Sequence, residues 1–146
     1  MRQNLKAYKK VNIDSSMAAA DPHQIIVMMF DGALESIALA KGAIERNELA
    51  LKSQMMTKAV NILTALQNSL DKEAQPEISE NFDFLYQYCI NKLNDVNITL
   101  DIAGIEEVNG YLKPLRDAWK EMPEEAKQEG LDLLKQKEDG RQAVGA

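Results

Sequence analysis

The chain has 146 residues and a formal net charge of −6, which is long enough for one domain with a buried core. No basic stripe suggests a nucleic-acid surface, and no apolar run approaches the roughly 18 residues of a membrane-spanning helix. The single cysteine, Cys89, excludes an internal disulfide framework, and the first residues contain no secretory signal. We therefore expect a cytoplasmic protein that binds no nucleic acid and inserts into no membrane.

The apolar periodicity predicts an all-α protein with three parts. They are an N-terminal arm over residues 1–20, an antiparallel four-helix bundle over 21–122, and a charged segment over 123–146. The last part leaves open a short fifth helix followed by a frayed tail. The arm is expected to be mobile, because its apolar residues lack helical spacing; these are Leu5, Tyr8, Val11 and Ile13.

The first predicted helix, over residues 21–46, begins at a strong cap. Asp21 is placed at the N-cap, Pro22 at the first helical position and Gln24 at the third, which is close to a capping box. Its core stripe comprises Ile26, Met29, Phe30, Ala33, Ile37, Ala40 and Ile44. A second seam with spacings of three and four lies beside it and comprises Ile25, Met28, Gly32, Ser36, Leu39 and Ala43.

Three more helices follow, joined by short connections that imply antiparallel neighbours. The second runs over about 47–70 with a stripe of Leu51, Met55, Ala59, Ile62, Leu63, Leu66 and Leu70. The third follows a loop over 71–77 and carries Ile78, Phe82, Leu85, Cys89, Leu93 and Val96. The fourth follows a predicted N-cap at Asp101 and carries Ile105, Val108, Leu112, Leu115, Trp119 and Met122.

The fourth helix contains one conflict with helical geometry. Pro114 cannot donate to the carbonyl of Gly110, and its ring crowds that carbonyl. The sequence therefore predicts a kink between these two residues, with complete breakage of the helix as the alternative.

The sequence offers little for catalysis, and we expect neither an enzyme nor a metal or other cofactor. The only histidine is His23, and no Glu-x-x-His motif or glycine-rich phosphate loop is present. Cys89 lies on a core stripe, which favours a buried, inert thiol. A histidine phosphotransfer bundle remains an alternative, although His23 falls in a first helical turn rather than in the middle of a helix.

Surplus apolar residues are the main functional signal. Besides the second seam of the first helix, the third helix carries Phe84 and Tyr88, four residues apart and away from the core stripe. One interpretation is the wide apolar sector that any bundle helix buries against two neighbours. A second interpretation is a groove for an amphipathic partner helix. A third is an adaptor that dimerises through the surplus apolar residues.

Several short motifs resemble the FliS family of flagellin export chaperones in the right order over about residues 7–122. They include "AYKK", "DPHQIIVMMFDGALESIALAKGAIER", "NDVNITLDIAGIEEV" and "LRDAW". The resemblance implies a cytosolic, non-enzymatic bundle, monomeric or weakly dimeric, that binds the C-terminal helical segment of flagellin, prevents its premature polymerisation and delivers it for export. It also suggests an export-gate component and an anti-sigma regulator as partners. The groove candidates are Ile25, Met28, Gly32, Leu39, Phe84 and Tyr88, and the arm residues Leu5, Tyr8, Val11 and Ile13 are candidates for a temporary cover.

Overall fold

The computed structural model describes residues 21–71 and 73–122, and these form four helices. The helices are α2 (Pro22–Glu45), α3 (Leu49–Asn68), α4 (Pro76–Thr99) and α5 (Ile102–Lys120). No strand occurs in the described ranges, so the predicted all-α class is confirmed. The expected arm and fifth helix fall outside the described residues.

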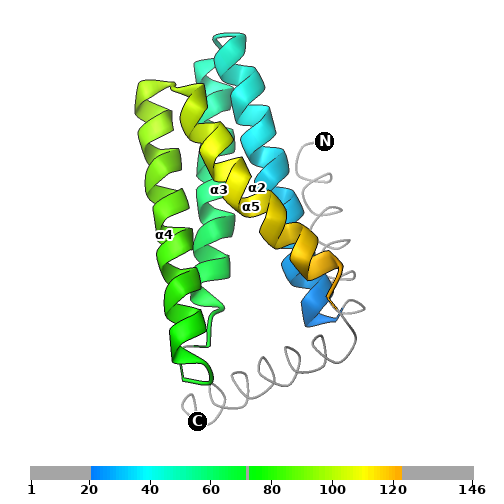
Figure 1. Ribbon diagram of the computed structural model, residues 1–146. Helices are drawn as coiled ribbons and strands as arrows, with labels where there is room; N and C mark the ends of the chain where they lie inside the picture. The colour runs from blue at the N-terminus through cyan, green and yellow to red at the C-terminus, as the bar shows by residue number, and fades with distance from the viewer. Residues whose placement is uncertain (1–20, 72, 123–146) are drawn as a thin grey trace, which may run out of the picture. The chain divides into compact units, whose positions relative to one another are not determined.

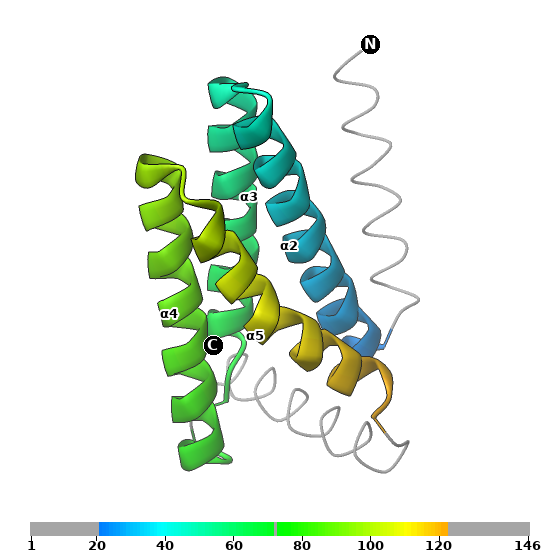
Figure 2. The same ribbon diagram turned by 45° about the horizontal axis from the view of Figure 1, so that its top comes forward.

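Residues 27–122 form one compact unit, whereas residues 21–26 belong to a second. Within the larger unit, consecutive helices run in opposite directions (Figure 1), and α4 packs against both α3 and α5. In both views α5 crosses between α4 and α2 (Figure 2). The short connections predicted from the sequence therefore do join antiparallel neighbours.

The core is aliphatic and follows the predicted stripes in α2 and α5 most closely. Phe30, Ile37, Ile105, Val108 and Leu112 are fully buried. Burial of this kind contributes roughly 1.5–3 kcal/mol per large side chain, which makes the shared core the main source of stability. The ring of Phe30 also lies 6.3 Å from that of Tyr86 on α4, so α2 and α4 meet across the centre of the bundle.

Two stripes differ from the prediction. In the first half of α3, Lys52 and Met56 are buried, whereas Leu51 and Met55, one position earlier, are only half-buried; the later predicted core residues Ala59, Leu63 and Leu66 are buried. At the start of α4, the expected core residue Ile78 is 52% exposed, and Ser79 is buried instead. The Ser79 hydroxyl donates to the carbonyl of Asp71 at 2.6 Å, which satisfies a polar group in the preceding loop.

The predicted caps form as expected. Asp21 Oδ1 accepts a hydrogen bond from the backbone N–H of Gln24 at 2.8 Å, with Pro22 as the first helical residue. Asp101 likewise accepts from the N–H of Ala103 at 3.0 Å and starts α5. Each carboxylate satisfies a donor that the helix itself leaves unpaired, and its negative charge suits the positive end of the helix dipole.

Helix α5 continues through Pro114, so the alternative of a broken helix is wrong. Gly110 and Pro114 are both exposed. The Gly110 carbonyl, which loses its helical donor at Pro114, is therefore on the solvent side, where water can replace the missing hydrogen bond. Beyond Leu112 the side chains of Leu115, Trp119 and Met122 are only half-buried, so the end of α5 is less firmly packed than its beginning.

The connection between α4 and α5 is tight. Leu100 adopts the left-handed conformation with φ of 62°, and its N–H donates to the carbonyl of Val96 at 2.7 Å. Gly104 then lies so close to α4 that a Cβ placed there would be 2.5 Å from Cγ2 of Val96. The two helices can approach this closely only because residue 104 has no side chain.

Candidate functional site

The six groove candidates are divided between two helices of the structure. Ile25, Met28, Gly32 and Leu39 belong to α2, whereas Phe84 and Tyr88 belong to α4. The two helices lie on opposite sides of α5 in both views (Figures 1 and 2). The candidates therefore form two separate surfaces rather than one groove.

The α2 surface is a narrow aliphatic stripe. Met28 and Leu39 are 44% and 46% exposed, and their separation of about three helical turns gives them almost the same direction. Ile25 and Gly32 are half-buried. The predicted second seam is thus only partly exposed, because Ser36 and Ala43 belong to the buried core.

Gly32 borders α3 rather than lying in the centre of the exposed stripe. A Cβ at this position would meet Cδ1 of Ile62 at 3.4 Å, which is an ordinary contact. Its carbonyl accepts a hydrogen bond from the Ser36 hydroxyl at 2.8 Å. A methyl group at position 32 would therefore only touch α3, so this glycine is not required by the packing of α2 against α3.

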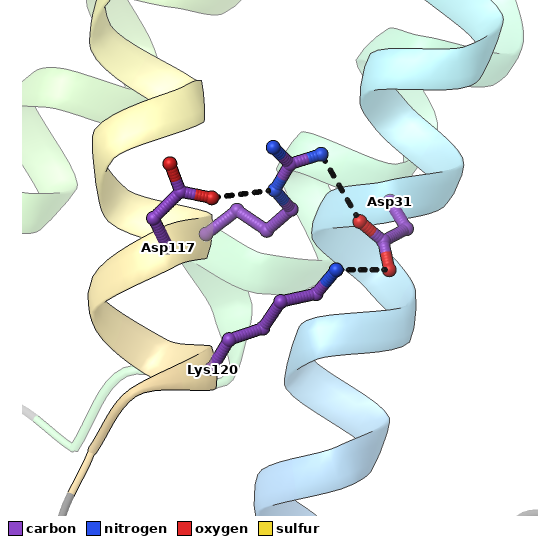
Figure 3. Close-up of polar contacts among 4 residues, drawn as sticks. Asp31, Asp117 and Lys120 are labelled. Atoms are coloured by element: carbon purple, nitrogen blue, oxygen red, sulfur yellow. Dashed lines mark hydrogen bonds and ion pairs between the residues drawn. The ribbon is translucent and has the colours of Figure 1, made fainter.

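Asp31 forms ion pairs with α5 while its side chain stays 44% exposed (Figure 3). Its carboxylate lies 3.5 Å from Nη1 of Arg116 and 3.8 Å from Nζ of Lys120. Arg116 also pairs with Asp117 through Nε at 3.1 Å. Because these groups remain partly exposed, each pair contributes at most about 1 kcal/mol, but together they orient the loosely packed end of α5 toward α2.

A second ion pair joins the same two helices near the start of α5. Lys41 Nζ lies 2.7 Å from Glu106 Oε1, and this hydrogen bond is the main reason that the pKa of Lys41 is raised and that of Glu106 lowered. Helices α2 and α5 are therefore joined by ion pairs at two levels along their length.

The α4 surface is aromatic. Phe84 is 74% exposed, and Tyr88, one turn later, lies edge to face with Tyr111 of α5 at a ring-centroid distance of 6.0 Å. The sequence reasoning missed Tyr111, because its neighbour Leu112 carries the core periodicity and Tyr111 lies at the edge of that stripe. Its position beside Tyr88 depends on the packing of α5 against α4.

Polar contacts hold Tyr88 in place. Its hydroxyl donates to Oε1 of Glu107 at 2.5 Å, and Lys92 approaches both Glu107, at 3.4 Å, and the Tyr88 ring, at 5.9 Å from its centroid. The hydrogen bond from Tyr88, followed by the contact with Lys92, lowers the pKa of Glu107, and the same bond raises the pKa of Tyr88. This cluster holds Tyr88 in a fixed position on a surface where it remains 37% exposed.

The two side chains that the sequence offered for catalysis, Cys89 and His23, are both buried. Cys89 is fully buried, and burial raises its pKa to about 11, so the thiol is held in its unreactive form. No group of three or more potential metal ligands is present in the described ranges. His23 is only 6% exposed, which argues against the solvent-facing histidine that a phosphotransfer protein needs. Across the described residues, no helix is both long and apolar enough to cross a membrane.

Comparison with known proteins identifies the family of this chain. The chain matches the model of the family described as flagellar protein FliS over residues 3–126. It is 37% identical over 123 residues to the flagellar secretion chaperone FliS of Salmonella typhimurium, covering 84% of this chain and 91% of that protein. The corresponding protein of Vibrio cholerae is 33% identical over 125 residues, covering 86% of this chain and 92% of that protein. The flagellar secretion chaperone FliS of Bacillus subtilis is 34% identical over 107 residues, covering 73% of this chain and 79% of that protein. The chain therefore belongs to the FliS family of flagellar proteins.

Proposed function

We propose that this protein is a flagellar secretion chaperone that binds the C-terminal helical segment of flagellin in the cytoplasm. The observation that carries the proposal is its similarity to proteins named flagellar secretion chaperone FliS over nearly their whole length. The exposed apolar side chains of Met28, Leu39, Phe84 and Tyr88 support a binding role.

The α2 stripe is the best candidate for the first client contact. Met28 and Leu39 are exposed, apolar and aligned on one face of α2, and half-buried Gly32 lies on the side of this face next to α3. Such a stripe suits an amphipathic client helix that presents its own apolar residues. Burying the exposed part of each large side chain contributes about 1 kcal/mol, which helps to offset the roughly 2–5 kcal/mol needed to order the client.

Binding this segment would prevent premature polymerisation by covering the apolar face that flagellin uses in assembly. Before the client arrives, the exposed apolar surface of the chaperone itself favours aggregation unless it is covered. We propose that Leu5, Tyr8, Val11 and Ile13, which lie outside the described residues, provide a temporary cover. Delivery of the client to an export-gate component, and an association with an anti-sigma regulator, are further parts of the proposal.

The direct test is calorimetric titration of the full chain with the C-terminal segment of flagellin from the same organism. One-to-one binding with a negative heat-capacity change is expected, because apolar surface is buried. The double variant Met28→Ala/Leu39→Ala should weaken binding about tenfold or more, since each truncation removes an exposed contact. The matched control is Thr57→Ala/Asn61→Ala on the exposed face of α3, which should leave affinity unchanged.

Two results would contradict this assignment. A complete lack of complex at tens of micromolar would overturn the chaperone proposal. Normal binding by the Met28/Leu39 variant would instead place the client away from the α2 stripe. Static light scattering on the same samples would distinguish a monomer or weak dimer from an adaptor that dimerises through its surplus apolar surface.

A further inference from the structure

The exposed face of α4 differs in chemistry from the α2 stripe. Phe84 and Ile98 are the two most exposed large apolar residues of the described chain, at 74% and 83%. They lie 14 residues apart, or about 21 Å along the helix, and point in directions only about 40° apart. Tyr88, 37% exposed, and Tyr111, 42% exposed, widen this apolar strip toward α5.

Acidic residues share this face with the apolar side chains, and exposed Asn91 also lies between Tyr88 and Ile98. Glu77 and Glu80 precede Phe84 on this face, and Asp95 lies between Tyr88 and Ile98; all three are exposed. In the described part of the chain none of the three forms an ion pair. Among the described residues, Lys92 lies beside the strip, but it already pairs with Glu107, although it also lies near Asp95.

From this arrangement we propose that the exposed face of α4 is a docking surface for a basic amphipathic helix of a second protein, separate from the client bound at α2. The aromatic and aliphatic side chains would receive the apolar stripe of that helix. Glu80 and Asp95, about 22 Å apart along α4, would pair with lysine or arginine residues on either side of the stripe. Phe84 and Tyr88 then belong to this partner surface.

The occupant is set by charge complementarity. A second copy of this chain would bring one acidic strip against another, which is unfavourable for a symmetric contact. A purely apolar helix would leave the acidic side chains dehydrated and unpaired at the rim. A helix with basic residues flanking an apolar stripe satisfies both parts of the surface. Since Tyr88 is already held by Glu107 and Tyr111, little side-chain entropy is lost when the partner binds.

The experiment uses a designed 18-residue helical peptide with a leucine and phenylalanine stripe flanked by lysines, and a second peptide in which glutamate replaces each lysine. Each peptide is titrated into isotopically labelled full-length protein and followed by amide chemical-shift changes. We expect the lysine peptide to shift residues along α4 between Glu80 and Ile98, with an affinity that falls as salt is raised. The glutamate peptide is expected to cause no such shifts.

Two pairs of variants identify the groups responsible. Glu80→Gln/Asp95→Asn should weaken the lysine peptide about threefold to tenfold, while the control Glu35→Gln/Glu45→Gln removes the same charge from the exposed face of α2 and should have no effect. Phe84→Ala should weaken binding about tenfold, whereas Leu39→Ala should not. Because Phe84 and Leu39 are exposed, both variants are expected to fold normally, which circular dichroism would verify.

A final titration of the lysine peptide in the presence of saturating flagellin segment tests whether the two surfaces are separate. Unchanged affinity supports the proposal. Displacement by the segment overturns it, as do equal binding of both peptides and shifts confined to α2. The first titrations contain no flagellin, so their outcome does not depend on the proposed client.

Discussion

The contact between α4 and α5 allows a sharp test of the packing, because α5 contains two glycines in opposite environments. A Cβ at Gly104 would lie 2.5 Å from Cγ2 of Val96, whereas a Cβ at Gly110 would have no neighbour within 4 Å. Both lie inside the same helix, so replacement by alanine gives the same intrinsic gain of roughly 0.5–1 kcal/mol at each position. Any difference between the two variants therefore reports the tertiary contact.

The cost at position 104 can be estimated from the overlap. Carbon atoms pack comfortably at about 3.5–4.0 Å, so the new methyl group would overlap Val96 by about 1 Å. Val96 is only 1% exposed, and α4 and α5 are joined through just Leu100 and Asp101, which restricts their separation. Overpacking of this kind costs about 1–3 kcal/mol. With so severe an overlap we expect the upper part of that range, and Gly104→Ala should be less stable by about 1–2 kcal/mol after the helix gain is subtracted.

Urea denaturation of the two single variants, followed by far-ultraviolet circular dichroism, is the appropriate assay. Gly110→Ala should be more stable than the parent protein by about 0.5–1 kcal/mol. The double variant Gly104→Ala/Val96→Ala should show favourable coupling, because the shortened side chain makes room for the new methyl group. If Gly104→Ala proved as stable as Gly110→Ala, the close approach of α4 and α5 would be wrong.

Three further predictions concern polar and titrating groups. Lys52→Met should destabilise the protein by about 1–3 kcal/mol in urea denaturation. The buried Lys52 side chain donates a hydrogen bond through Nζ to the carbonyl of Asn97 at 2.7 Å, near the C-terminal end of α4, and the variant leaves this carbonyl without that donor. Unchanged stability would mean that water replaces the Lys52 donor without cost. Tyr88→Phe should raise the pKa of Glu107 in an NMR titration. The stabilisation from this hydrogen bond is present above the pKa of Glu107 in the unfolded chain and is lost as the pH falls through its lowered pKa in the folded protein. The stabilities of the parent protein and the variant should therefore converge in acid. An unchanged pKa of Glu107 in the variant would refute the hydrogen bond. Cys89, whose pKa is raised to about 11, should react with a disulfide reagent at pH 8 only as fast as the protein unfolds, and rapid labelling of the native protein would show that the thiol is accessible.

The positions of the helices could be predicted from the sequence because their signals are local. Asp21 and Asp101 each cap a helix through a hydrogen bond to a backbone N–H two or three residues away. The period of the apolar residues likewise gave most of the core of α2 and α5, since a helix places residues three and four positions apart on one face. Such features depend on a few neighbouring residues and need no knowledge of the rest of the fold.

The register of α3 and the environment of Asp31 depended on other helices. Apolar spacing favoured Leu51 for the core, but the buried residue is Lys52, because the end of α4 provides an acceptor for its amine. Asp31 pairs with Arg116 of α5, which lies 85 positions later in the chain. Neither acceptor nor cation can be assigned from the periodicity of a single helix.

The candidate surfaces also depend partly on local sequence and partly on the packing of the helices. The sequence alone determined which side chains were surplus to a simple core stripe, including Met28, Leu39, Phe84 and Tyr88, because this follows from helical spacing. Only the tertiary structure decided that they form two surfaces, that Ser36 is buried, and that Tyr111 completes the aromatic cluster on α4 and α5. The physical reason is that exposure depends on how whole helices pack and cross, and that packing sums contacts between residues far apart in the chain.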